Sequence, residues 1–267
     1  MSAIISIAGL EKRFKSRQGL EQVALQNVDL EIGASEFFCL LGPSGCGKTT
    51  VLNILAGFER PTRGTVTMNG AAIAQPGADR AVVFQGDDSL FNWLTALQNI
   101  EFGLRMRGMP RRERRERAAY YIDLVGLKGQ EHKHPNELSG GMKQRIQIAR
   151  VLANEPKVLL MDEPFAALDA QTRLLMQEQL ARIWQRTKTS VLFVTHDIDE
   201  AIILGTRVGV MRAGPAANIK ATVDVKLDNH RSRTNADFMR IYAQVYEMIR
   251  EEVLSAMSNT APGEQTP

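Results

Sequence analysis

Gly42-Pro43-Ser44-Gly45-Cys46-Gly47-Lys48-Thr49 is the segment from which the fold class of this chain follows. It matches the pattern GxxxxGK[ST], in which a glycine-rich loop joins a strand to a helix. The apolar run Phe37–Leu41 precedes the loop, and Thr49–Ala56, which ends at Gly57, has the pattern of a helix. Both elements that such a loop requires are therefore predicted, and an accidental match is the weaker interpretation.

The chemistry of this loop is that of an anion site. Its backbone N–H groups point inward, and its glycines permit a close approach to phosphate that a side chain would block. Lys48 is expected to neutralise the β- and γ-phosphates, and the Thr49 hydroxyl to coordinate Mg²⁺. The predicted nucleoside triphosphate site consists of loop residues and the start of the helix: Gly42, Pro43, Ser44, Gly45, Cys46, Gly47, Lys48, Thr49 and Thr50.

Two acids follow an apolar strand further along the chain. Val158–Met161 leads directly into Asp162 and Glu163. Asp162 is suited to the second shell of a metal ion, and Glu163 is suited to orient or deprotonate an attacking water. Alone, this pattern is an ordinary boundary between strand and loop. In a chain with a phosphate-binding loop, it favours hydrolysis.

A second helix N-terminus has the features of an anion site. Leu138-Ser139-Gly140-Gly141-Met142 offers a hydroxyl and bare backbone amides where a helix should begin. One chain then has two phosphate-binding helix ends but a single Lys48 and a single acid pair. The economical explanation is that two chains assemble head to tail, each completing the other's site. The alternative is that Ser139 is an N-cap followed by flexible glycines.

Strands and helices alternate over most of the chain, which predicts a mostly parallel sheet and an α/β fold. The region 4–32 has the pattern of short strands, and Val28–Ile32 alternates as a half-buried strand does. From residue 86 to residue 153 the pattern turns helical. The other predicted elements are strands at 64–68, 81–84, 157–161 and 190–194, and helices from residue 139 and at 171–186.

Two segments have open interpretations. Arg105–Arg117 contains seven arginines, which favour a solvated helix face over a patch for phospholipid or nucleic acid. Asp237–Met257 is predicted to be an amphipathic helix with Phe238, Ile241, Val245 and Ile249 on one stripe. It is either a packing helix or a regulatory and docking element. Residues 258–267 are expected to form a disordered tail.

Composition excludes several classes of protein. The formal net charge of +3 indicates neither a nucleic-acid partner nor an acidic substrate. The two cysteines form no plausible disulfide framework, which suits a reducing cytosol. No signal peptide is expected at the N-terminus, and no window of 18 uninterrupted apolar residues predicts a membrane span.

In the order of these motifs, the chain from about Leu10 to Met211 resembles the ATPases of the ABC family. The resemblance implies ATP and Mg²⁺ as cofactors, with Thr49, Gln85 and Asp162 around the metal, Asp162 through water. It implies that Phe14 stacks on adenine, the alternative being a core aromatic, and that His196 contacts the γ-phosphate. Gln85 would sense Mg²⁺ and the attacking water, and Asp169 of Ala167-Leu168-Asp169 would communicate between the two sites. Glu163, His196, Gln85 and Lys48 are the expected catalytic residues, and the signature residues that would bind nucleotide are Ser139, Gly140, Gly141 and Met142.

The resemblance also implies an architecture. It is a P-loop NTPase (RecA-like) core with a mostly parallel sheet, an antiparallel β subdomain and an inserted α-helical subdomain. The expected boundaries are 1–86 and 155–225 for the core, 87–154 for the helical subdomain with the signature, and 226–257 for a C-terminal helical extension. The chain departs from the family at Met142, where Gln is usual, and at Ala166, where Ser is frequent. Neither departure removes a phosphate ligand, so an active enzyme is expected.

Two sequence segments, Ser89–Thr95 and Asp162–Asp169, are similar to the corresponding segments of ATPases that serve nitrate, sulfonate, taurine and bicarbonate importers. This similarity implies a peripheral subunit on the cytoplasmic face of the membrane, working with a second ATPase subunit, a permease and an external solute-binding protein. The permease would contact the region from Gln85 to Trp93, although Trp93 has the alternative of a core position. A soluble ABC ATPase in repair, translation or lipid trafficking is the second hypothesis. The chain lacks the CxxC pairs, sustained heptads and second glycine loop frequent in such proteins. An inactive binding module is the third, and the intact catalytic residues argue against it.

Overall fold

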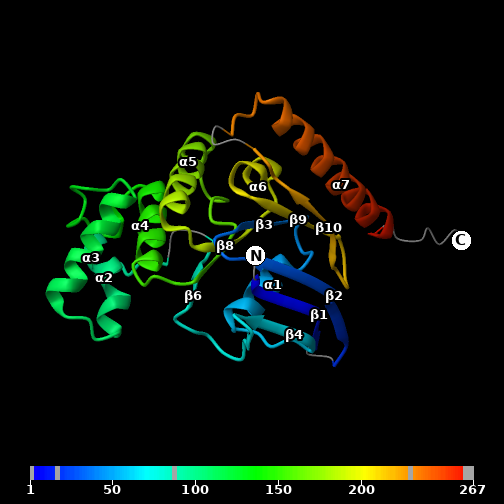
Figure 1. Cartoon of the computed structure of the whole chain (residues 1–267), viewed down its shortest axis with the longest axis horizontal. Coiled ribbons are helices and arrows are strands. Elements are labelled where there is room, and N and C mark those ends of the chain that lie inside the picture. Colours follow the sequence, from blue (N-terminus) through cyan, green and yellow to red (C-terminus); the bar gives the residue numbers. More distant parts are fainter. Residues whose placement is uncertain (1–2, 16–18, 86–88, 228–230, 261–267) are drawn as a thin grey trace, which may run out of the picture. The chain divides into compact units, whose positions relative to one another are not determined.

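The computed structural model describes residues 3–15, 19–85, 89–227 and 231–260, with side chains described as far as residue 255. The chain divides into two compact units, residues 1–75 with 192–267 and residues 76–191. Figure 1 labels many of the elements of both units. The division falls at other points than the expected subdomain boundaries, which stay a prediction.

The first unit begins with an antiparallel sheet in the strand order β2-β1-β4-β5. Its strands are β1 (Ala3–Lys15), β2 (Glu21–Gly33), β4 (Arg63–Met68) and β5 (Ala71–Ala72). Within residues 28–32 of β2, the apolar side chains are buried and the acidic ones are exposed, as the alternation predicts. The expected antiparallel β subdomain is therefore confirmed.

A second set of strands in this unit has the order β10-β9-β3-β8. These strands are β3 (Phe37–Leu41), β8 (Ser190–Thr195), β9 (Arg207–Met211) and β10 (Ile219–Asp224), and β8 begins in the other unit. β3 runs parallel to β9, with Leu40 opposite Gly209, whereas β10 is antiparallel. Every residue of β3 is buried, which is typical of parallel strands with both faces covered. β10 lies where the sequence pattern is weak and was not predicted.

The helix α1 (Lys48–Ala56) follows the glycine loop, as predicted from the sequence. It ends at Gly57, whose φ of 80° is left-handed and whose N–H bonds to the carbonyls of Asn53 and Ile54. A glycine adopts this C-cap conformation without a steric penalty. The predicted end of the helix is therefore confirmed.

The C-terminal part of the first unit contains α6 (Ile198–Leu204) and α7 (Ala236–Thr260). α7 packs on α6 and β9 through Phe238, Ile241 and Val245, which are buried. Ile249, the fourth residue of the predicted stripe, is only half-buried. α7 continues through residues 258–260, past the expected start of the tail at residue 258. Residues 261–267 lie outside the described part of the chain.

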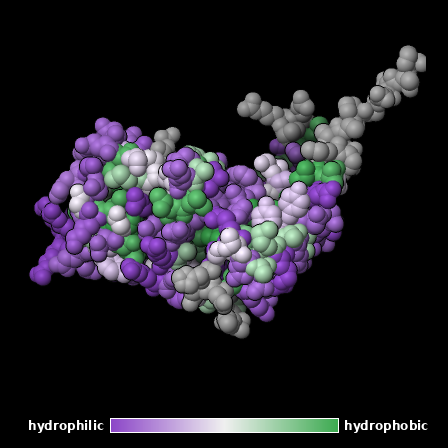
Figure 2. Space-filling model, turned by 90° about the horizontal axis from the view of Figure 1, so that it is seen from above, coloured by the Kyte–Doolittle hydropathy of each residue, from purple (hydrophilic) through white to green (hydrophobic). Residues whose placement is uncertain are grey.

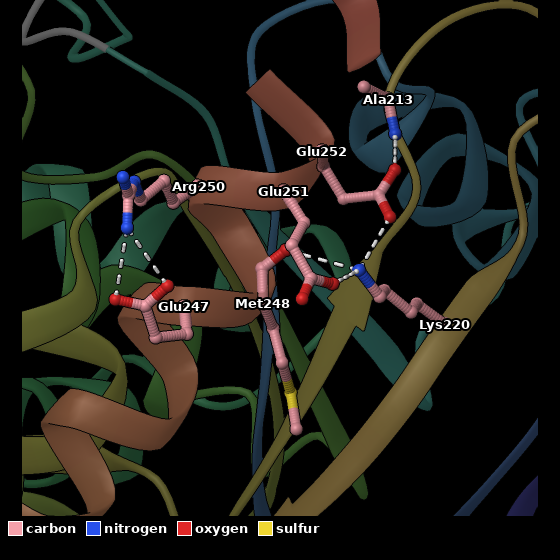
Figure 3. Close-up of polar contacts among 7 residues, drawn as sticks. All are labelled: Ala213, Lys220, Glu247, Met248, Arg250, Glu251 and Glu252. Carbon is pink, nitrogen blue, oxygen red and sulfur yellow. Dashed lines mark hydrogen bonds and ion pairs between the residues drawn. The ribbon is translucent and has the colours of Figure 1, made fainter. Parts of the chain in front are cut away.

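Polar contacts fasten the C-terminal half of α7 to the rest of the unit (Figure 3). Lys220 Nζ of β10 lies 2.7 Å from Glu251 Oε2 and 2.8 Å from Glu252 Oε1. The backbone N–H of Ala213 donates to Glu252 Oε2 at 2.9 Å. We call these four residues the α7 clamp.

The second unit contains two parallel strands and most of the helices. β6 (Arg80–Val83) pairs with β7 (Val158–Asp162), with Val83 opposite Met161. The helices are α2 (Ala96–Met106), α3 (Arg111–Leu124), the short 3-10 helix η1 (Pro135–Glu137), α4 (Gly140–Leu152) and α5 (Ala170–Thr187). The predicted helical texture of this region is confirmed.

The arginine-rich segment is divided between two helices. α2 ends before Gly108, whose φ is 74°, and α3 begins after Pro110. Within it, Arg112 pairs with Glu116 at 2.9 Å and Arg114 with Glu101 at 3.2 Å. The exposed pair of Arg112 and Glu116 agrees with the solvated helix face that the sequence favours, whereas the pair of Arg114 and Glu101 is partly buried.

Apolar surface is limited on the face shown in Figure 2, where hydrophilic residues predominate and apolar residues form separate areas. Among the described residues, no helix combines the length and the apolar character that a membrane crossing requires.

Candidate active site

The glycine loop between β3 and α1 has the backbone of an anion site. Gly45 and Gly47 have φ of 78° and 91°, the left-handed region that glycine adopts readily. An added Cβ on Gly47 would lie 2.7 Å from Leu25 Cδ2, so packing as well as φ requires glycine there. Gly47 is the N-cap of α1 and has no side chain to cap it, and the first turn contains no acid. The amides of that turn therefore suit a bound anion.

Lys48 lies over the same loop. It is only 5% exposed, and its Nζ donates to the carbonyls of Gly42 at 2.8 Å and Pro43 at 2.9 Å. A buried ammonium next to a concave row of amides is the charge arrangement that a triphosphate needs. The loop residues of this chain thus fit a nucleotide phosphate.

Phe14 lies near the end of β1 and is 39% exposed. Lys12 Nζ lies 4.8 Å from the centre of the ring, a cation–π contact. The exposure speaks against the alternative that Phe14 is a core aromatic. Stacking of the ring on adenine stays a prediction.

His196 follows β8 in a tightly bonded turn of the first unit, and its side chain is exposed. The Thr195 hydroxyl donates to Glu200 Oε2 at 2.6 Å and accepts from the N–H of Asp197 at 3.0 Å. Asp197 in turn caps α6 by accepting from the N–H of Glu200. Sequence reasoning missed Thr195 and Glu200, because a buried threonine has no motif of its own.

In the second unit, three of the predicted residues lie at the carboxyl ends of the parallel strands β6 and β7. Val83 is opposite Met161, so Gln85 and Glu163 each lie two residues beyond a paired position, and Asp162 ends β7. The carboxyl ends of parallel strands are where α/β folds place their ligands. Glu163 has φ of 41°, and its carbonyl accepts from the N–H of Ala166 at 3.2 Å. Such a strained position is typical of functional turns.

Ser139 is the N-cap of α4. Its Oγ accepts from the N–H of Met142 at 3.3 Å, as the N-cap alternative predicts. Gly140 and Gly141 form the first turn, with no acidic side chain in it. The capping role and a role at a phosphate are compatible, since amides of the first turn also serve an anion.

Asp169 is the N-cap of α5 and is fully exposed. Its carboxylate accepts from the backbone N–H groups of Thr172 at 3.0 Å and Gln171 at 3.1 Å. Hydrogen bonds from Thr172 and Gln171 lower the pKa of Asp169 below its ordinary value. The carboxylate is therefore ionised at neutral pH.

The start of α5 lies against the start of α4. A Cβ added to Gly141 would lie 2.7 Å from Thr172 Cγ2, and one added to Gly140 would lie 3.9 Å from Leu168 Cδ2. The predicted communicating loop and signature of one chain are thus neighbours, which the sequence motifs did not indicate. Of the two departures from the family, Ala166 is exposed and Met142 is half-buried.

The predicted residues form two groups, one in each unit. Phe14, the loop Gly42–Thr50 and His196 belong to the first unit, whereas Gln85, Asp162, Glu163, Asp169 and Ser139–Met142 belong to the second. The donor set proposed for Mg²⁺, a hydroxyl, an amide and a carboxylate, consists of the oxygen ligands that this ion prefers. The protein class defined by this fold and these residues is a P-loop ATPase.

Comparison with known proteins identifies the family. The family described as ABC transporter matches residues 25–166. An uncharacterized ABC transporter ATP-binding protein of Methanocaldococcus jannaschii is 46% identical over 257 residues, 96% of this chain and 95% of the relative. The nitrate import ATP-binding protein NrtD of Synechocystis is 49% identical over 79% of each chain. The taurine import ATP-binding protein TauB of Chromobacterium violaceum is 51% identical over 76% of this chain and 77% of the relative.

A solved structure agrees with these relatives. The dimeric ATP-binding cassette MJ0796 in a post-hydrolysis state, bound to ADP and Pi, superposes with a TM-score of 0.71 at 32% identity. The match covers 84% of this chain and 99% of that one. The chain belongs to the ABC transporter family, is an ATPase of that family, and resembles its importer branch.

Proposed function

We propose that this chain is the ATP-hydrolysing subunit that powers import of a small solute through a separate membrane permease. The observation that carries most weight is the glycine loop with buried Lys48, which forms a phosphate cradle between β3 and α1. The similarity to nitrate, bicarbonate and taurine transport proteins supports a small solute of this kind, and the proposal includes sulfonate among the candidates.

The chain's own residues have the following proposed roles. Lys48 and the loop amides bind the phosphates of ATP, and Phe14 stacks on the base. Glu163 orients or deprotonates the attacking water, and His196 contacts the γ-phosphate. Bound Mg²⁺ would neutralise charge on the phosphate oxygens, with Thr49, Gln85 and, through water, Asp162 as its donors. Asp169 communicates with the second site.

The proposed assembly is a head-to-tail dimer at the cytoplasmic face of the membrane. Ser139–Met142 of each chain completes the phosphate site of the other. The permease contacts the region from Gln85 to Trp93, and an external binding protein delivers the solute. The exposure of Trp93, 73%, supports a partner surface and speaks against a core role.

Glu163→Gln tests the enzymatic part of the proposal. Loss of a general base typically reduces turnover by about 10²–10⁴, which is roughly 3–5 kcal/mol of barrier. ATP binding, measured with a fluorescent nucleotide, should remain. If the variant hydrolyses ATP at the wild-type rate, Glu163 does not take part in the reaction.

Co-purification tests the transport part. A tagged chain expressed with its permease should be recovered with that apolar partner. Recovery of the chain alone, or with nucleic acid, would favour the second hypothesis, a soluble ABC ATPase in a non-transport role.

A further inference from the structure

Lys12 of β1 is buried, which is rare for a lysine unless its ammonium is paired. The residue is 9% exposed, and its Nζ donates to Glu59 Oε2 at 2.7 Å and to the Arg60 carbonyl at 2.9 Å. The same Nζ lies 4.8 Å from the centre of the Phe14 ring. A buried ammonium with these partners has a fixed position, because each contact restricts a side chain that is otherwise flexible.

The carboxylate and the carbonyl that hold Lys12 belong to the segment that follows α1. The backbone N–H of Glu59 donates to the carbonyl of Asn53, a residue of α1, at 3.2 Å. α1 begins at Lys48, directly after the glycine loop. The ammonium that lies over the Phe14 ring is therefore connected to the helix that follows the phosphate loop.

A second connection passes through the strand next to β1. Lys12 is opposite Leu25 of β2 in the antiparallel pair. Leu25 packs against Gly47 of the glycine loop, since a Cβ added to that glycine would lie 2.7 Å from Leu25 Cδ2. The part of β1 that contains Lys12 is thus connected to the loop itself, and all of these residues belong to the first unit.

The position of the ammonium limits how Phe14 can meet a base. A cation is attracted to one face of an aromatic ring, so a base that stacks on Phe14 must use the other face. Phe14 is 39% exposed and lies one residue before the end of β1. A contact that orders such a side chain in advance reduces the entropy that ligand binding must otherwise remove.

We propose that Lys12 is a positioning residue for nucleotide binding. It fixes the Phe14 ring relative to the phosphate loop, so that the ring receives the base of a nucleoside triphosphate whose phosphates occupy the loop. The proposal rests on the proposed function, in which Phe14 stacks on the base. It adds that Lys12 acts on the affinity for the base and not on the affinity for the phosphates.

Lys12→Met tests this role with two ligands, ATP and inorganic tripolyphosphate, which has the phosphates but no base. Calorimetry without Mg²⁺, which the proposed reaction requires, measures both affinities. The affinity for ATP should fall by roughly threefold to thirtyfold, a change of the size of a cation–π contact. The affinity for tripolyphosphate should stay at the wild-type value. The matched control is Lys15→Met, which removes the same charge from an exposed position of β1 and should change neither affinity.

Two further variants separate positioning from a general effect on stability. Lys12→Arg retains the charge and the donors, so it should restore most of the affinity for ATP. In a chain that already has Phe14→Ala, Lys12→Met should cause no further loss of ATP affinity, because the ring through which Lys12 acts is absent. If the loss is the same with and without the ring, Lys12 does not act through Phe14 and the proposal is wrong.

The segment after α1 has further bonds to β1 that do not involve the ammonium. The N–H of Thr62 donates to the Glu11 carbonyl at 2.8 Å, and the N–H of Arg13 donates to Thr62 Oγ1 at 3.0 Å. If Lys12→Met nevertheless fails to fold, Glu59→Gln is the second variant, since the Glu59 side chain is 41% exposed. It should lower the affinity for ATP and leave that for tripolyphosphate unchanged. Wild-type affinity for ATP in Glu59→Gln would contradict the proposal.

The possible failures point to different errors. If Lys12→Met weakens the binding of both ligands equally, or of neither, the proposed role of Lys12 is wrong, and the proposed stacking of Phe14 is unaffected. If Phe14→Ala alone changes neither affinity, the proposed stacking is wrong, and this inference fails with it.

Discussion

Thr195 connects the residues of the turn that presents His196. Its hydroxyl donates to the buried Glu200 and accepts from the N–H of Asp197, and Asp197 caps α6. All of these contacts lie within one unit and join residues at most five positions apart. The backbone on both sides of His196 is therefore held by hydrogen bonds that do not involve its imidazole.

Thr195→Val keeps the shape of the side chain and removes these hydrogen bonds. Loss of a donor to a buried carboxylate typically costs about 1–3 kcal/mol of stability. We expect a lower midpoint in urea unfolding and a reduced kcat with little change in ATP affinity. Thr222→Val, at an exposed position of β10, is the control and should match the wild type. If the two variants have the same kcat, the hydrogen bonds of Thr195 do not position His196 for hydrolysis.

At the scale of elements, α7 is held by two kinds of contact. Its N-terminal half packs through buried apolar residues, whereas its C-terminal half depends on the α7 clamp. Burial raises the pKa of Glu252, but the hydrogen bonds from Lys220 and the Ala213 amide lower it further, so the net shift is downward. The hydrogen bonds that Lys220 donates to Glu251 and Glu252 raise the pKa of Lys220.

The directions of these two pKa shifts determine the pH range over which the α7 clamp stabilises the protein. The depressed pKa of Glu252 contributes stability above its ordinary value of 4.5, and this is lost as pH falls through the lowered pKa. The raised pKa of Lys220 contributes stability below its ordinary value of 10.5, and this is lost as pH rises through the raised pKa. The clamp is therefore complete over the neutral range.

Lys220→Met should loosen the C-terminal half of α7. Partly exposed ion pairs contribute about 0.2–1 kcal/mol each, so we expect a small loss of global stability and faster amide exchange in residues 246–255. The difference in stability between this variant and the wild type should be constant near neutral pH. It should disappear in acid and under strongly alkaline conditions. Lys226→Met, an exposed lysine outside the clamp, is the control. A difference that persists unchanged in acid would contradict the clamp.

Each chain has its phosphate loop and its signature helix end in different units. In a two-fold dimer, each chain contributes the same residues to its partner's active site as the partner contributes to its own. The proposed head-to-tail pairing thus makes each active site a product of two chains. It follows that two inactive variants with complementary defects should restore each other.

Lys48→Ala and Gly140→Asp are the two variants for this test. The first loses the phosphate-binding ammonium, and the second places a negative charge at the signature helix end. An added Cβ at Gly140 meets only Leu168 Cδ2 at 3.9 Å, whereas at Gly141 it would clash with Thr172, so Gly140 is the position that accepts a side chain. Each variant alone should lack ATPase activity.

An equal mixture should recover about a quarter of wild-type activity, because half of the dimers are mixed and each has one intact site. ATPase assays on the mixture, with each variant alone at the same total concentration, measure this. A mixture no more active than its components would rule out sites shared between chains.

Much of the fold and of the candidate site could be predicted because the relevant patterns are contiguous. The glycine loop, the apolar run of β7 before Asp162 and Glu163, and the alternation in β2 each lie within a few residues. β10 was missed because it is defined by its pairing with β9 and not by a local pattern, and Thr195 because its partner lies on the next helix.

The phosphate loop, the acid pair after β7, the family and the mostly parallel α/β class could be recognised in the sequence, since these follow from local residue types and periodicity. The contact of Thr172 with Gly141, the attachment of α7 by Lys220, and the ion pair of Lys12 with Glu59 became visible only in the folded chain. These features join residues distant along the chain, and packing rather than any local pattern decides which of them meet.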